Sequence, residues 1–146
     1  LATNSQAVAE KGIQEAAGII ANQVRANIQA LPAVKDIENI KAYKEGRKAH
    51  LSIKQKQGLL ESLGITPVAL DNGFYNAKIG FDGYNGIRTK KYPKGQPNQL
   101  IARVAESGST YMDKTPFMRK ALTASRAKAL QRMQEIIDNE LEKIMK

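Results

Sequence analysis

The chain has 146 residues, the size of one ordinary domain, and its 42% hydrophobic and 25% charged residues are typical of a globular protein. No run approaches the roughly 18 apolar residues that a membrane span requires, and the absence of cysteine excludes disulfides and thiolate metal sites. The net charge of +9, from 23 basic and 14 acidic residues, favours polyanions or an acidic protein as a partner.

The first predicted element is a helix over about residues 4–31. Its apolar residues recur at intervals of three and four, which places them on one face of a helix: Ile13, Ala17, Ile20, Val24, Ile28 and Leu31. Asn4 or Ser5 is the expected N-cap, and Pro32 is expected to end the helix.

The pattern from residue 33 to residue 64 is less regular. Val34, Ile37 and Ile40 indicate a short helical piece, and Leu51–Ile53 alternates like the start of a strand. Residues 57–64 read as a short helical turn that ends at a glycine. The range 35–57 is also rich in charge, with seven basic residues and three acidic ones.

The middle of the chain, about residues 51–87, is predicted to be rich in strand. The segments Ile65–Leu70 and Phe74–Phe81 flank Asp71-Asn72-Gly73, a strong hairpin-turn signal. In the second segment alternate residues are apolar, as a strand with one buried face requires: Tyr75, Ala77, Ile79 and Phe81. Residues 88–99, with two prolines and a glycine, are predicted to form a loop.

Two helices are predicted after this loop. Leu100 to Ala105 has helical spacing, with Asn98 as the expected cap and Gly108 as the expected end. A long helix is predicted over about residues 116–146, with Thr115 as its N-cap and Pro116 at its first position. The apolar stripe of this helix, which is either core or a subunit interface, comprises Met118, Leu122, Ala129, Met133, Ile137, Leu141 and Ile144.

These elements predict a single α+β domain over residues 1–146, with a small antiparallel sheet packed by a long N-terminal helix and a long C-terminal helix. No catalytic arrangement is apparent: His50 is the single histidine, and Gly80, Gly83 and Gly86 lack the Lys-Ser/Thr of a phosphate-binding loop. We therefore expect His50 at the surface or in a turn, and a protein that is not an enzyme and has neither a cofactor nor a metal.

Basic residues without acidic neighbours mark one candidate contact surface. Between Tyr84 and Ala105 there are five cations and no acid, namely Arg88, Lys90, Lys91, Lys94 and Arg103. One aromatic residue, Tyr92, stands among them, as in surfaces that follow a phosphate backbone or stack on bases. The two interpretations left open are contact with DNA and a loop that faces solvent or a partner protein.

Four short motifs follow one another in order: residues 57–65 (QGLLESLGI), 78–85 (KIGFDGYN), 101–108 (IARVAESG) and 115–121 (TPFMRKA). With these motifs the chain, from about Lys54 to Lys146, resembles the tail-component family of long-tailed bacteriophages (siphophages), the neck or tail-completion proteins. We expect Glu106, Gly108, Pro116 and Phe117 to be structural anchors. In this interpretation the carboxylate of Glu106 pairs either with Arg103 or with a neighbouring subunit.

The resemblance implies a structural virion protein made in the cytoplasm of the host bacterium and located at the head–tail junction. It implies self-association into a ring, hexameric or dodecameric, and docking onto the head–tail connector or stopper and onto tail tube or terminator proteins. Channel DNA is a further partner that it implies, and no membrane contact is expected. The alternative from another class is a basic regulatory protein that binds nucleic acid.

Overall fold

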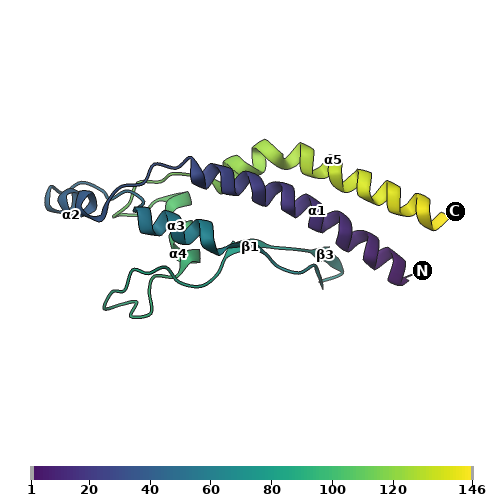
Figure 1. Cartoon of the computed structure of the whole chain (residues 1–146), viewed down its shortest axis with the longest axis horizontal. Coiled ribbons are helices and arrows are strands. Elements are labelled where there is room, and N and C mark those ends of the chain that lie inside the picture. The colour runs from purple at the N-terminus through teal and green to yellow at the C-terminus, as the bar shows by residue number, and fades with distance from the viewer. Residues whose placement is uncertain (1, 146) are drawn as a thin grey trace.

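The structure, a computed structural model, describes residues 2–145, with the side chains of residues 5–145. Two long antiparallel helices, α1 and α5, lie side by side; α2, α3 and α4 gather at their end away from the termini, and the strands lie beside α1 (Figure 1). In chain order the elements are α1 (Ala2–Gln29), α2 (Asp36–Lys44), α3 (Ile53–Ser62), β1 (Leu63–Ile65), β2 (Ala69–Asp71), β3 (Phe74–Asn76), β4 (Ile79–Phe81), α4 (Asn98–Ser107) and α5 (Met118–Met145). This is the α+β fold that the sequence predicts.

The predicted apolar face of α1 is confirmed, because every one of its six members is buried or half-buried. The predicted N-cap is wrong. The helix begins at Ala2, so Asn4 and Ser5 lie inside its first turns. Gln29 is its last residue, and the N–H of Ala30 still donates to the carbonyl of Ala26 at 3.1 Å before Pro32 follows.

The buried face of α5 agrees with the predicted stripe only in part. The helix buries mostly small side chains, namely Ala121, Ser125, Ala129 and Ile136. Of the predicted stripe, Ala129 is buried and Met118, Met133 and Ile137 are half-buried, whereas Leu122, Leu141 and Ile144 are 38%, 45% and 42% exposed. The reason is that α5 packs chiefly on one partner, α1, so small residues that let two helix backbones approach decide which face turns inward.

The strand predicted at Leu51–Ile53 is wrong, and the region called rich in strand contains a helix. Ser52 is the N-cap of α3: its Oγ accepts from the N–H of Gln55 at 3.1 Å, and Oε1 of Gln55 accepts from the N–H of Ser52 at 2.9 Å. This reciprocal capping box satisfies two N–H groups that have no partner within the helix. The helix ends at Ser62, and Gly64 lies in β1 instead of ending it.

The predicted hairpin is present, as a ribbon of two short antiparallel ladders. β2 pairs with β3 around Asn72 and Gly73, whose φ values of 50° and 82° fit a type I′ turn. β1 pairs with β4, with Ile65 opposite Ile79. The two ladders are separated near Pro67, which has no N–H to donate to a ladder. The ribbon lies beside α1 (Figure 1).

The core lies where α1, α3, α4, β4 and the start of α5 meet. Phe117 is its largest fully buried side chain. Its ring meets the ring of Phe81 edge to face, with 6.0 Å between the centroids and 77° between the planes. This contact attaches the residue before α5 to β4 of the ribbon.

Candidate nucleic-acid or partner interface

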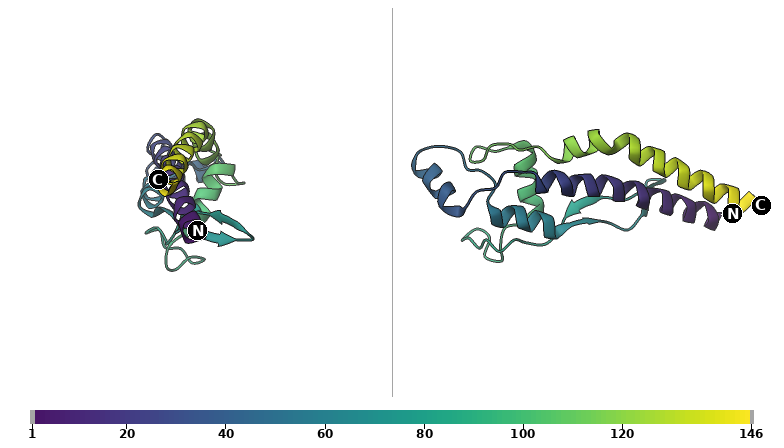
Figure 2. Two further views of the ribbon diagram at one scale, coloured as in Figure 1. Left: turned by 90° about the vertical axis from the view of Figure 1, so that its right-hand side faces the viewer. Right: turned by 45° about the horizontal axis from the view of Figure 1, so that its top comes forward.

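The predicted basic loop is an exposed excursion of the chain between β4 and α4. Four cations extend from it and are exposed, namely Arg88, Lys90, Lys91 and Lys94. The loop lies near the end of the molecule that is opposite to the two termini (Figures 1 and 2). It presents positive charge away from the helix pair.

The base of this loop is closed by a buried amide network. Asn85 is 7% exposed, and its Oδ1 accepts from the N–H groups of Ile87 and Gln96 at 2.9 and 3.0 Å. The N–H of Asn85 donates to the carbonyl of Gln96 at 2.9 Å, and Nδ2 of Asn85 donates to Oε1 of Gln96 at 3.1 Å. Three of these four hydrogen bonds join Asn85 to Gln96 and so connect the two ends of the loop.

A second link fixes this base to the rest of the fold. Oε1 of Gln96 also accepts from Nε2 of Gln55 at 3.2 Å, and Gln55 is the residue that completes the capping box of α3. Gly95 has a φ of +109°, and a Cβ at this position would overlap the carbonyl oxygen of Asn85. The loop is thus attached to the N-terminus of α3 through side chains that are themselves held in place.

Inside the loop the backbone forms a compact turn. The N–H of Tyr92 donates to Oγ1 of Thr89, and the N–H of Thr89 donates to the carbonyl of Tyr92, each at 3.0 Å. Nζ of Lys91 lies 5.5 Å from the centroid of the Tyr92 ring, within cation–π range. Tyr92 is therefore half-buried and engaged within the loop, whereas the sequence pattern alone indicates an open stacking surface.

Arg103, the fifth predicted contact residue, is on a different element. It lies on α4, and its side chain is exposed. The structure also corrects the cap of this helix: Asn98 is its first residue, and Pro97 occupies the N-cap position. Asn98 is buried, and its Nδ2 donates to the carbonyl of Asp82 at 3.1 Å.

Glu106 has a structural role that differs from both predicted ones. Its Oε2 accepts from the N–H groups of Phe117 and Met118 at 2.7 and 2.8 Å, and its Oε1 accepts from the N–H of Arg119 at 3.0 Å. The carboxylate therefore caps α5 from the end of α4, and Thr115 is not the cap because α5 begins at Met118. Neither Arg103 nor a neighbouring subunit is needed to explain Glu106.

The environment of Glu106 shifts its titration in a defined direction. Partial burial raises the pKa of this carboxyl, but the three backbone hydrogen bonds and the nearby charge of Arg119 outweigh it. The pKa consequently falls below the ordinary value of 4.5. The positive end of the α5 dipole favours the charged form as well.

The other predicted anchors lie at the same connection. Gly108 ends α4 with a φ of +77°, and its N–H donates to the carbonyl of Val104 at 2.7 Å. A Cβ at this position would lie 3.1 Å from Cβ of Lys114. This conformation favours glycine. Pro116, half-buried, precedes the fully buried Phe117. Glu106, Gly108 and Phe117 together fix the angle between α4 and α5.

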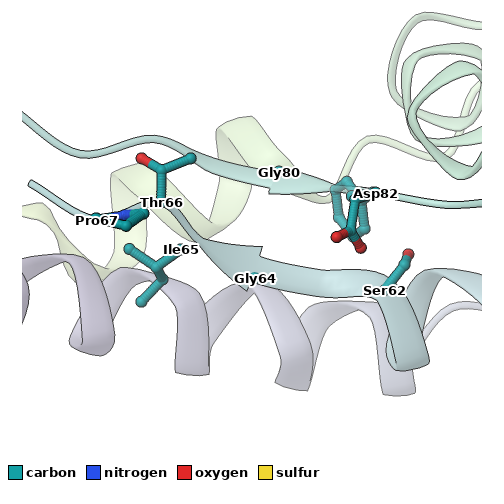
Figure 3. Close-up of a pocket in the computed structure, with 8 residues that line it drawn as sticks. Ser62, Gly64, Ile65, Thr66, Pro67, Gly80 and Asp82 are labelled. Atoms are coloured by element: carbon teal, nitrogen blue, oxygen red, sulfur yellow. The ribbon is translucent and has the colours of Figure 1, made fainter.

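A hollow of about 370 Å³ runs along the ribbon (Figure 3). Ser62 and Asp82 lie at one end of it and Thr66 and Pro67 at the other. Oγ of Ser62 is 3.5 Å from the carbonyl of Leu59, to which it donates. The lining contains no histidine or lysine that could activate this hydroxyl.

A second hollow, of about 280 Å³, lies between the end of α2 and the segment before α5. Tyr43, Arg47, Lys48 and Tyr111 contribute to its lining. Sequence analysis did not identify it, because Tyr43 and Tyr111 are far apart in the chain and each is an isolated aromatic residue. Only the backbone pairing of Ala49 with Met112 brings the two segments together.

His50 is exposed, as expected, and its backbone exchanges two hydrogen bonds with the side chain of Asn39, both 2.9 Å long. Among residues 2–145 there is no group of three His, Cys, Asp or Glu side chains with the geometry of a metal site. In the same part of the chain no helix is long and apolar enough to cross a membrane. Comparisons with protein-family models, curated proteins and solved structures find no match to this chain.

Proposed function

We propose that this chain is a structural protein of the bacteriophage virion, a neck or tail-completion component that forms a ring at the head–tail interface. The observation that carries the proposal is the ordered set of four motifs described above. Each motif contributes at least one residue to the buried core: Leu59, Phe81, Ile101 with Ala102 and Ala105, and Phe117 with Ala121. The resemblance therefore rests on residues that determine how α3, β4, α4 and α5 pack, and the function is inferred from it by analogy.

The roles of the polar side chains support a structural function for this protein. The carboxylate of Glu106 caps a helix, and the amides of buried Gln55 and Asn85 and of half-buried Gln96 hold the base of a loop. These groups are engaged in structural hydrogen bonds. The polar feature that projects outward is the basic loop, whose four cations face channel DNA or an acidic surface of a partner ring. In a ring, all copies of the loop lie at one level and form a positive belt.

The mass of the protein in solution tests this proposal. We expect light scattering over a concentration series, at low and moderate salt, to show a closed hexamer or dodecamer, and electron microscopy to show rings. A persistent monomer or dimer that binds DNA tightly would contradict the proposal and favour the regulatory protein.

The basic loop favours that second candidate, because it has four exposed cations and no acid. A fourfold serine variant of Arg88, Lys90, Lys91 and Lys94 separates the two functions. If the loop binds phosphates, each lost contact lowers the slope of log K against log salt by about 0.9. A matched control replaces four exposed cations of α5 with serine: Arg119, Lys120, Arg126 and Lys128. Equal DNA affinity of both variants would show that binding follows net charge rather than the loop.

A further inference from the structure

Charge is distributed unevenly along the molecule. α1 and α5 have 28 residues each, about 42 Å at 1.5 Å per residue, and both termini lie at one end of the pair (Figures 1 and 2). In residues 5–15 and 132–145, at this end, six acidic residues accompany three basic ones, Lys11, Arg132 and Lys143, and Arg132 pairs with Glu15 and Glu135. The six acidic residues are Glu10, Glu15, Glu135, Asp138, Glu140 and Glu142. We call this region the acidic tip.

The opposite end is strongly basic. Residues 35–56, which comprise α2, its connections and the first turn of α3, hold seven basic and three acidic residues, and the loop at 86–96 adds four cations without an acid. Figures 1 and 2 place α2 and the loop at the end away from the termini. The molecule is therefore an elongated body with charge of opposite sign at its two ends.

The basic end contains the hollow that Tyr43 and Tyr111 line. The chain around it is ordered by backbone hydrogen bonds: the N–H of Arg47 donates to the carbonyl of Ala42 at 2.8 Å, and the N–H of Ala49 donates to the carbonyl of Tyr111 at 2.7 Å. Tyr43 and Tyr111 are nevertheless 81% and 76% exposed. Aromatic side chains that are exposed to this degree are typical of surfaces that bind a partner.

The acidic tip carries exposed apolar side chains that could contact the tyrosines of this hollow. Leu141, Ile144 and Met145 are 45%, 42% and 85% exposed. Their spacing of three and four residues puts them on one side of α5, and Asp138 precedes them by one turn. A helix with this pattern is suited to lie in an apolar groove with cations on its rim. Two cations line the hollow, Lys48 and Arg47, and the guanidinium of Arg47 also pairs with Glu45 at 2.6 Å.

We propose that the acidic tip of one copy docks into the Tyr43–Tyr111 hollow of the next copy. The occupant is a second copy of this chain because the two surfaces complement each other in charge and both present exposed apolar groups. This inference rests on the proposed function in one respect only, that copies of the chain associate.

The geometry of this contact has a consequence for assembly. The tip and the hollow are different surfaces, so each bound copy still offers one of each, and association continues until a ring closes or a filament grows. A symmetric contact between two tips would instead bring two surfaces of net negative charge together, which like-charge repulsion opposes.

Charge reversal at each end, followed by mixing, tests the proposal. The tip variant is Glu135→Lys with Asp138→Lys. The hollow variant is Lys48→Glu, in the lining, with Lys44→Glu, which follows Tyr43 at the end of α2. All four residues are exposed. Each variant alone should associate at least about tenfold more weakly than the unaltered chain, since like charges then meet across the contact. Mixed in equal amounts, they should associate again, because the basic tip of one fits the acidic hollow of the other.

The matched control is Arg126→Glu with Lys128→Glu, which changes net charge as the hollow variant does but lies on exposed positions in the middle of α5. Circular dichroism of each variant checks that the helices are retained. Sedimentation velocity over a concentration series measures association, and the control should behave like the unaltered chain.

An unaltered chain that stays monomeric would overturn the inference. So would single variants that associate normally, or a mixture of the two variants that does not associate again. Loss of DNA binding by the hollow variant with unchanged self-association would also overturn it and assign the hollow to a polyanion. Rings that survive both reversals would refute this contact and leave the proposed neck function standing. Open head-to-tail filaments without rings would support the contact and count against the neck function.

Discussion

The capping of α5 by Glu106 leads to the most quantitative prediction. Three backbone N–H groups at the start of a 28-residue helix share one carboxylate. Loss of one N-cap bond costs about 1 kcal/mol, and hydrogen bonds to a charged group contribute about 1.5–3 kcal/mol each. Glu106 is only half-buried, so water replaces part of what is lost. We expect Glu106→Ala to lower the free energy of unfolding by about 3 kcal/mol.

Glu106→Gln separates the charge from the hydrogen bonds. Its amide oxygen can still accept from Phe117 and Met118, but the bond to Arg119 and the negative charge at the helix N-terminus are lost. The expected cost is about 1–2 kcal/mol. Urea unfolding followed by circular dichroism measures both variants. The control is Glu61→Gln, which removes an exposed carboxylate on α3 that accepts only a side-chain hydrogen bond from Gln57.

The pH dependence of this difference tests the same reasoning. The pKa of Glu106 is lower in the folded protein than its ordinary value of 4.5. The stabilisation is therefore fully present above about pH 4.5 and is lost as the pH falls through the folded pKa. The stability gap between the unaltered chain and Glu106→Gln should narrow from pH 7 towards pH 3. A gap that is zero at pH 7, or that does not change with pH, would refute the capping role.

Three further predictions concern packing and order. Phe117→Ala should cost about 3–5 kcal/mol in urea unfolding, because the side chain is fully buried against Phe81; an unchanged melting temperature would contradict this packing. Gly18→Ala should stabilise by about 0.5–1 kcal/mol, since its new Cβ meets no atom within 4 Å, whereas Gly12→Ala should gain less because its Cβ would lie 3.2 Å from Met133. Asn85→Ala should speed trypsin cleavage within the basic loop several-fold while circular dichroism shows the helices intact; unchanged cleavage would mean that the amide network does not order the loop.

Local signals predicted those parts of the fold that depend on neighbours in the chain. The type I′ turn at Asn72 and Gly73 follows from two residues that tolerate positive φ, and Gly108 ends α4 for the same reason. The face of α1 followed from periodicity, because this helix is flanked by α5 on one side and by α3 and the ribbon on another. A wide buried face of large apolar residues can be recognised from their spacing in a sequence.

The candidate site was only partly predictable. The cations of the loop are adjacent in the sequence, so their common exposure was foreseeable. The network that orders them was not, because Gln55 and Gln96 are 41 positions apart and each amide alone is compatible with solvent. The same holds for the hollow, which one backbone pairing between residues 49 and 112 assembles.

By itself, then, the sequence determined the long helices α1 and α5, the shorter helix α4, the hairpin turn, the α+β class and the exposed basic loop, since these follow from backbone preferences and periodicity over a few residues. The tertiary structure decided which group caps α5, which face of α5 is buried and where the two charged ends lie. Glu106 can cap α5 only after α4 has folded back beside it, and small residues such as Ala121 and Ala129 become core only because another helix backbone approaches them. Those outcomes depend on which surfaces meet, and local sequence patterns do not specify that.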